Sequence, residues 1–308
     1  MQNNRTDAPP TRARPPTATA DQRVAGIAGG VLAALIWGGY VVVTRHAVTG
    51  HLPADELTFL RVAVAGAIML PFMFHWGWRR LAGVGWRHGL TLTLLGGAFF
   101  SLIFIAGMSF APVSHGATIA PSVVMLTTLV LSWRWLGERP TGRRLAGSLV
   151  VFAGLLTMGW DGFAATAGPR AWIGDLMFVT AGLMWGTFTF LCRRWRIDPW
   201  RATAAVWSLS FLLYAVPYPL IVKPAFAAAW PELLLQAVYQ GALGAVVATV
   251  AYTRAVAALG AARAALFPTL VPAIGVLVAI PVLGEWPSAV QAVGVGIVVA
   301  GMVLAIGR

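Results

Sequence analysis

The segment Leu136-Gly137-Glu138-Arg139-Pro140 returns near the end of the chain as Leu283-Gly284-Glu285-Trp286-Pro287, a shift of 147 positions. Several single residues obey the same shift, and Trp37-Gly38 matches Trp185-Gly186 at a shift of 148. The pairs related by 147 are Pro121 with Pro268, Gly97 with Gly244, Gly147 with Gly294, and Gly154 with Gly301. Self-similarity at a fixed spacing is typical of an internal duplication. The sequence therefore predicts two homologous halves.

Composition indicates that both halves lie in a membrane. The chain is 58% hydrophobic and 10% charged, with a mean hydropathy of +0.77, whereas soluble chains are roughly 25% charged. The apolar residues form runs of about 20, the length that a helix needs to cross a bilayer. The predicted spans are 25–44, 57–75, 89–110, 114–133, 143–160, 173–192, 202–221, 233–254, 262–282 and 288–306. Because these runs do not alternate as barrel strands do, we predict an all-α membrane protein with ten transmembrane helices.

The net charge of +12 follows the predicted topology. With the N-terminus placed inside, all but four of the 22 Lys and Arg residues fall in the inner segments. The exceptions are Arg45, Arg61, Arg170 and Lys223. This asymmetry is the positive-inside rule, and it predicts that both termini are cytoplasmic. The basic excess thus indicates orientation in a lipid bilayer, and we expect no nucleic-acid partner.

We divide the chain into four parts. Residues 1–24 are rich in Arg, Pro and Thr and are predicted to be a disordered cytoplasmic tail. The two five-helix repeats cover 25–160 and 173–308, and the linker 161–172 joins them on the outer side. Because five is an odd number of spans, the second repeat enters the membrane from the opposite side and the repeats are inverted. Inverted repeats suit alternating access, although a channel built from such a duplication remains an alternative.

The chain resembles a known family through a combination of features. These are the Trp-Gly of the first span, Phe59-Leu60-Arg61 in the second, and the Gly-Glu after the fourth and ninth. Together with ten spans and the duplication, they resemble the drug/metabolite transporter superfamily of EamA type over residues 25–308. Within it the chain resembles bacterial exporters of amino acids, in particular aromatic ones, in the cytoplasmic (inner) membrane. The resemblance implies a central cavity lined by spans 1, 3, 4, 6, 8 and 9, with the 3–4 and 8–9 hairpins as gates.

Aromatic and polar side chains near the middle of the spans are the candidates for contact with a substrate. Trp and Tyr at span ends usually form interfacial belts, but several of these residues lie in mid-span. We predict as substrate-binding residues Trp37, Tyr40, Phe99, His115, Trp185, Phe188, Tyr239, Gln240 and Tyr252. Ordinary helix packing is the alternative for the aromatic residues, and a boundary histidine bonded to water or backbone is the alternative for His115. Arg61 is expected to extend its long stem to the outer surface, with a role in substrate binding as the alternative.

Small and helix-breaking residues are the candidates for gates. Glycine allows helices to approach closely, and proline removes a backbone donor and bends a helix. The predicted hinge or gate residues are Gly38, Gly97, Pro121, Gly244, Pro268 and Pro272. Pro121 and Pro268 are related by the duplication, which suits a matched pair of hinges, with static kinks as the alternative.

No Asp or Glu lies near the centre of a predicted span, and this absence bears on the cargo. Transporters of organic cations usually keep a buried carboxylate as counter-ion or proton carrier. We therefore predict export of amino acids or related metabolites, with aromatic or large neutral amino acids as the small-molecule substrate. The alternatives are a multidrug or quaternary-amine exporter of the same fold, and a non-transporting membrane component. No catalytic motif, metal site or cofactor site is found, so no enzyme and no cofactor are predicted.

Overall fold

The computed structural model describes residues 19–49, 52–165, 169–222, 226, 228–283 and 286–306. Over these ranges the chain is helical and contains no strand. Nine stretches within them are long and apolar enough to cross a membrane. They are Ala20–Thr44, Ala54–His75, Trp86–Gly107, Ser114–Leu136, Ala171–Arg194, Pro199–Ile221, Trp230–Leu259, Ala261–Val278 and Ala289–Ile306. Most of the predicted tail, residues 1–18, lies outside the described residues.

The described residues of the first half form six α-helices, because the third predicted span is divided in two. They are α1 (Ala20–Thr49), α2 (Ala54–His75), α3 (Trp86–Gly96), α4 (Ala98–Gly107), α5 (Val113–Leu131) and α6 (Gly142–Ala165). A short 3-10 helix, η1 (Trp78–Arg80), follows α2, and a π-helical turn, η2 (Ser132–Leu136), ends the fourth span. Helix α6 covers the predicted span 143–160 but is not among the nine apolar stretches, and its first turn carries Arg143 and Arg144.

In the second half, eight α-helices and three irregular helical segments lie within the ranges that the structure describes. The α-helices are α7 (Ala171–Arg194), α8 (Pro199–Ser210), α9 (Tyr218–Ile221), α10 (Trp230–Gln236), α11 (Ala248–Leu259), α12 (Ala261–Ala264), α13 (Val271–Leu283) and α14 (Ala289–Ile306). The π-helical segments η3 (Phe211–Ala215) and η4 (Ala237–Val247) and the 3-10 helix η5 (Phe267–Leu270) join them. Helix α8 begins where the Asp198 carboxylate accepts hydrogen bonds from the N–H groups of Trp200 and Arg201, a common N-cap arrangement.

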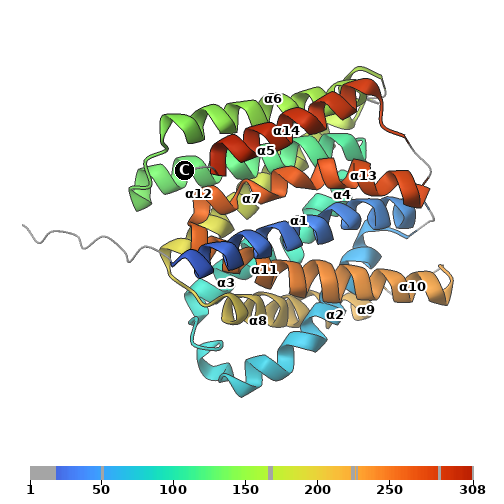
Figure 1. The fold of residues 1–308 in the computed structure, drawn as a ribbon. Helices are drawn as coiled ribbons and strands as arrows, with labels where there is room; N and C mark the ends of the chain where they lie inside the picture. Colours follow the sequence, from blue (N-terminus) through green and yellow to red (C-terminus); the bar gives the residue numbers. More distant parts are fainter. Residues whose placement is uncertain are drawn as a thin grey trace, which may run out of the picture.

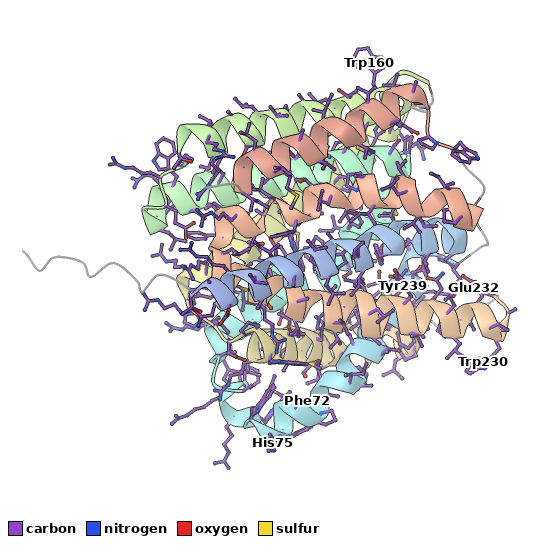
Figure 2. The ribbon with its side chains drawn as sticks, in the orientation of Figure 1. Phe72, His75, Trp160, Trp230, Glu232 and Tyr239 are labelled. Atoms are coloured by element: carbon purple, nitrogen blue, oxygen red, sulfur yellow. The ribbon has the colours of Figure 1, made fainter. Side chains whose placement is uncertain are left out.

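The axes of the long helices are roughly aligned, so that the helices form a bundle with two ends (Figure 1). Helix α1 begins and α14 finishes at the same end, which we call the terminal end; the other is the distal end. Figure 2 shows Trp160 and Trp230 toward the distal end, and they are 67% and 75% exposed. Exposed tryptophans at the ends of apolar helices are typical of the boundary between lipid and water.

Helices α6 and α14 lie side by side at one edge of the bundle (Figure 1) and pack through four glycines. A Cβ atom added to Gly147, Gly154, Gly294 or Gly301 would lie 2.5–2.8 Å from a backbone nitrogen of the facing helix. These nitrogens belong to Ala305, Val298, Met158 and Val151, respectively. Adding 147 to the residue on α6 and subtracting 147 from the residue on α14 turns each of these contacts into another of the four. The two antiparallel helices are therefore related by a local two-fold axis.

A second pair of close contacts links the halves through the repeated Trp-Gly. Gly186 on α7 packs against the side chain of Thr127 on α5, and Gly38 on α1 packs against Ile274 on α13. The repeat relates Thr127 to Ile274 just as it relates Gly186 to Gly38. Each half thus packs its first helix against the fourth helix of the other half, and the centre of the molecule lies between these two contacts.

The third and eighth spans are irregular at equivalent positions. Gly97 separates α3 from α4, with φ −101° and ψ −141°, and the Ala98 N–H donates to Ser210 Oγ at 3.0 Å instead of to its own helix. Gly244, the equivalent of Gly97, lies inside the π-helical segment η4. Both breaks put backbone polar groups within reach of side chains from neighbouring helices.

The predicted proline hinges differ between the halves. Helix α5 continues through Pro121. By contrast, Pro268 lies in η5, after a turn that follows α12, and Pro272 lies in the first turn of α13. The ninth span is therefore interrupted where the fourth is continuous, so the duplication is not reproduced in backbone detail.

Replacing Gly147 by Ala should destabilise the protein, because the added methyl group meets the backbone of α14. Overpacking of this kind costs about 1–3 kcal/mol, which corresponds to a fall of about 2–10 °C in unfolding temperature. Gly296→Ala on α14 is the matched control, since nothing lies within 4 Å of its added Cβ. Thermal unfolding of the two purified variants in detergent measures the difference. Equal unfolding temperatures would contradict the glycine-mediated packing of α6 on α14.

Candidate functional site

A cavity lies between the two halves, and its ≈ 740 Å³ of non-atom space includes the part that is open to solvent. The first half contributes α1, α2, α4 and α5 to its wall, and the second contributes α7, η5 and the start of α13. The lining residues are Trp37, Tyr40, Val41, Arg61, Phe100, Ser101, Phe104, Gly116, Ala117, Ala120, Pro121, Val124, Ala181, Trp185, Pro268 and Val271. The lining is apolar and aromatic apart from a few polar groups, which is usual for a site that binds a small organic molecule.

A cluster of aromatic rings forms one wall of the cavity and continues beneath it. Trp185 lies at its centre, with ring centroids 5.5 Å from Trp37, 5.0 Å from Phe100, 4.9 Å from Phe188 and 5.8 Å from Tyr252. Trp37 and Trp185 meet edge to face at 86°. Offset and edge-to-face pairs of this kind hold rings in fixed positions. The cluster therefore gives the cavity a rigid aromatic surface drawn from three helices.

Two of the predicted residues, Phe188 and Tyr252, lie below this surface instead of in it. Both are fully buried, and neither lines the cavity. The Tyr252 hydroxyl is hydrogen-bonded to Thr189 Oγ1 at 2.9 Å, so its polar group is satisfied inside the bundle. Their position supports Trp185 and Trp37 from behind.

Trp37 is held by the irregular backbone of the eighth span. Its indole Nε1–H donates to the carbonyl oxygen of Gly244 at 3.1 Å. In a regular α-helix that carbonyl oxygen would accept a hydrogen bond from the N–H group of the residue four positions later. The π-helical geometry of η4 alters this backbone hydrogen bonding, and the Trp37 indole donates to the carbonyl oxygen instead. The predicted hinge Gly244 therefore positions a residue of the cavity wall that comes from the other half.

Arg61 lines the cavity, and the expectation that it extends to the outer surface is wrong. The residue is only 5% exposed, on α2, two turns from the distal end of that helix. Its guanidinium lies over the ring of Tyr40, 5.1 Å from the centroid, and over that of Trp207 at 5.2 Å. The sequence signal was present, because an arginine inside an apolar span usually faces the interior of the bundle.

Three other predicted residues lie away from the cavity. Phe99 is 51% exposed and faces outward, while its neighbour Phe100 lines the wall. The Tyr239 hydroxyl (Figure 2) donates to the Ile36 carbonyl at 3.2 Å. The side-chain amide of Gln240, fully buried, donates from Nε2 to Thr44 Oγ1 at 3.0 Å. The last two join the eighth span to α1, and the structure does not bring them to the cavity.

His115 lies at the start of α5, one residue before the lining residues Gly116 and Ala117. Its Nδ1 is 2.7 Å from Asp175 Oδ1 on α7. The histidine is almost fully buried, whereas the aspartate is partly exposed. This pair joins the two halves beside the cavity at its distal side, and His115 itself is not in the wall.

At the terminal end, Glu138 of the repeated Gly-Glu contacts the other half. Arg193 on α7 donates to the Ala257 carbonyl at 2.8 Å, and its Nε is 3.7 Å from Glu138 Oε1. A Cβ atom added to Gly260, whose φ is +90°, would lie 3.1 Å from that same oxygen. The loop after the fourth span therefore meets the eighth–ninth turn across the interface. The second copy of the motif, at Gly284 and Glu285, lies outside the described residues.

The cavity differs in one helix from the lining that the family resemblance implied. The eighth span contributes no lining residue among those described, although its backbone holds Trp37. The second span takes a place in the wall instead, through Arg61. Phe100, Phe104 and Ser101 in the third span and Val124 in the fourth also line it and were not foreseen, because mid-span position alone does not reveal which face of a helix points inward.

The fold and this cavity define a polytopic membrane transporter, and the comparisons with known proteins name its family. The model of the EamA-like transporter family matches twice, over residues 24–160 and 172–307. The chain belongs to this family, within the drug/metabolite transporter superfamily, and contains two EamA repeats. It is a transporter and not an enzyme.

Individual relatives are distant. An uncharacterized transporter of Archaeoglobus fulgidus is 24% identical over 89% of this chain and 94% of its own length. A probable terminal-alkyne amino-acid exporter of Streptantibioticus cattleyicolor is 29% identical over 61% of this chain and 62% of its own. One solved crystal structure of a protein aligns with a TM-score of 0.69 over 94% of this chain and 97% of its own, at 20% identity. That likeness shows the fold alone.

Removing the ring at the centre of the cluster should impair transport. Trp185→Ala removes one ring of the cavity wall. Since an aromatic pair contributes about 0.5–1.5 kcal/mol, loss of the contact between this ring and a ring of the solute should raise KM roughly two- to tenfold. Trp78→Ala is the control, because Trp78 packs on Phe74 and Trp86 away from the cavity. Uptake into proteoliposomes compares the two. Equal effects would contradict the assignment of Trp185 to the site.

Proposed function

We propose that this protein exports amino acids or related metabolites, most of all aromatic or large neutral amino acids. The observation that carries the proposal is the composition of the cavity wall. It presents the rings of Trp37, Phe100, Phe104 and Trp185, and no carboxylate is among its described lining residues. Such a wall binds an apolar ring by burial and stacking, and it offers no counter-ion to an organic cation.

The proposed setting is a bacterial cytoplasmic (inner) membrane, crossed ten times, with both termini inside. The two described ends of the chain lie at the same end of the bundle, as an even number of crossings requires (Figure 1). Basic residues between the spans at this end, such as Arg79, Arg80, Arg139 and Arg196, support placing it in the cytoplasm. Helix α6 serves as the tenth span, packed against α14.

Alternating access is the proposed mechanism. The two-fold relation between the halves gives the bundle two similar ways to open, one toward each side. At the terminal end, the contact of Glu138 with Arg193 would separate when the cavity opens to the cytoplasm. At the distal end, His115 and Asp175 occupy the corresponding place between the halves. Gly97 and Gly244 lie where the backbone is already irregular, and these are the proposed hinges.

One relative supports the cargo. The protein of Streptantibioticus cattleyicolor that shares 29% identity is described as a probable amino-acid exporter. The alternative cargo, a quaternary amine, also rests on the aromatic wall, because ring faces attract cations. The cationic Arg61 in that wall opposes it, since like charges in a poorly solvated site repel.

Uptake into proteoliposomes tests the proposal directly. Radiolabelled tryptophan, phenylalanine, alanine and a quaternary amine would be offered to the reconstituted protein, with and without an imposed pH gradient. We expect saturable uptake of the two aromatic amino acids without the gradient, because no buried carboxylate in the described wall is available to carry a proton. Liposomes without protein supply the background.

The other outcomes revise specific parts of the proposal. Uptake of the quaternary amine alone would replace the cargo with an organic cation. Aromatic uptake that requires the gradient would keep the cargo and make His115 with Asp175 the first groups to examine for proton coupling. Absence of flux for all four solutes from a well-folded protein would contradict the proposed transport of amino acids.

A further inference from the structure

We propose that Arg61 binds the carboxylate of the transported solute, so that the cavity selects molecules with an apolar ring and an anionic group. This inference rests on the proposed function and narrows its substrate class. It concerns aromatic amino acids and aromatic carboxylic acids, which share the carboxylate, and it excludes aromatic amines. The argument depends on the burial of Arg61, on its partners and on its place in the cavity.

Arg61 is a buried cation without a carboxylate partner among the described residues. It is 5% exposed, and no ion pair involving it is found in the part of the chain that the structure describes. Burial of an unpaired charge is costly, and in membrane proteins such charges mark substrate or ion pathways. An anion bound in the cavity would offset that cost, so the site favours a solute that supplies one.

The guanidinium of Arg61 is held in place by its neighbours, but most of its N–H donors form no hydrogen bond. Its two terminal nitrogens lie 3.5 Å from the carbonyl oxygens of Gln240 and Gly244, at the long limit for a hydrogen bond. Its Nε has no hydrogen-bond partner. Because a guanidinium has five N–H donors, most of its capacity remains unused. The rings of Tyr40 and Trp207 hold it from the sides without consuming a donor.

The aromatic wall and the guanidinium of Arg61, which are the two parts of the proposed site, adjoin each other at the Gly244 carbonyl. Arg61 and Trp37 share the Gly244 carbonyl, which accepts from both side chains, and both residues line the same cavity as Trp185 and Phe100. A solute whose ring rests on the aromatic wall therefore has a guanidinium beside it. The planar fork of arginine matches a carboxylate through two parallel hydrogen bonds, whereas the amino group of an amine would be repelled.

A purely structural role for Arg61 makes a different prediction. Arg61 also joins α2 to the π-helical segment η4, and loss of that contact alone would reduce the uptake of every solute by the same factor. Loss of a carboxylate site changes the preference among solutes. Selectivity is therefore the readout that separates the two roles.

Three indole compounds provide the test, because they share a ring and differ in charge. Tryptophan carries a carboxylate and an amine, indole-3-propionate carries only the carboxylate, and tryptamine carries only the amine. Uptake of each would be measured with the full-length protein and the variants Arg61→Gln and Arg61→Lys in proteoliposomes. Arg134→Gln is the matched control, since Arg134 is exposed at the end of the fourth span.

The native protein should take up tryptophan and indole-3-propionate and discriminate against tryptamine. In Arg61→Gln, KM for the two carboxylates should rise about 10- to 100-fold, the effect of losing a hydrogen bond to a charged group, while tryptamine uptake should stay the same or increase. Arg61→Lys keeps the positive charge but loses the planar guanidinium that binds both carboxylate oxygens, so an intermediate KM is expected. Arg134→Gln should behave as the native protein.

Two results would overturn the inference while leaving amino-acid transport intact. One is a folded Arg61→Gln protein that keeps the native preference for tryptophan over tryptamine. The other needs no variant: a native protein that takes up tryptamine as readily as tryptophan has no carboxylate requirement. Failure of the native protein to take up any of the three would instead contradict the proposed function.

Discussion

The backbone polar groups within the bundle need partners from the protein, because a lipid bilayer supplies no water to replace a missing hydrogen bond. The irregular third and eighth spans show how this constraint shapes the centre. Where the backbone breaks at Gly97, Ser210 accepts the freed N–H group of Ala98. Where it widens at Gly244, Trp37 and Arg61 donate to the freed carbonyl. Each partner comes from the other half, so the breaks also join the repeats and place Trp37 and Arg61 in the cavity wall.

Much of the fold could be predicted from the sequence, because bilayer thickness fixes helix length and the duplication fixes the arrangement of the halves. Each predicted run contains helix, and the glycines that the repeat relates, such as Gly147 and Gly294, meet across α6 and α14. The division of the third span at Gly97 and the π-helix of the eighth were not predicted. Both depend on partners from other spans, which hydropathy does not reveal.

The candidate site was only partly visible in the sequence. Trp37, Tyr40 and Trp185 lie in the cavity wall, as their mid-span positions suggested. Phe99 and Phe100 show that mid-span position does not reveal which residue faces the cavity. Adjacent residues on a helix point about 100° apart, so either ring could have faced inward. For Arg61, position near a span end favours extension to the surface, because the sequence does not show the aromatic rings of Tyr40 and Trp207 that enclose the guanidinium in the fold.

The duplication does not extend to the charge in the cavity wall. The position that corresponds to Arg61 in the second half is Ser208 at the shift of 147 and Leu209 at the shift of 148, and both residues are buried and neutral. The two halves thus share a repeat but differ in charge at the cavity. With its carboxylate bound by Arg61 as proposed, a dipolar solute would have one preferred orientation between them. It would keep that orientation while the bundle rocks around it. On the proposed role of Arg61, the same end of the molecule would lead across the membrane in every cycle.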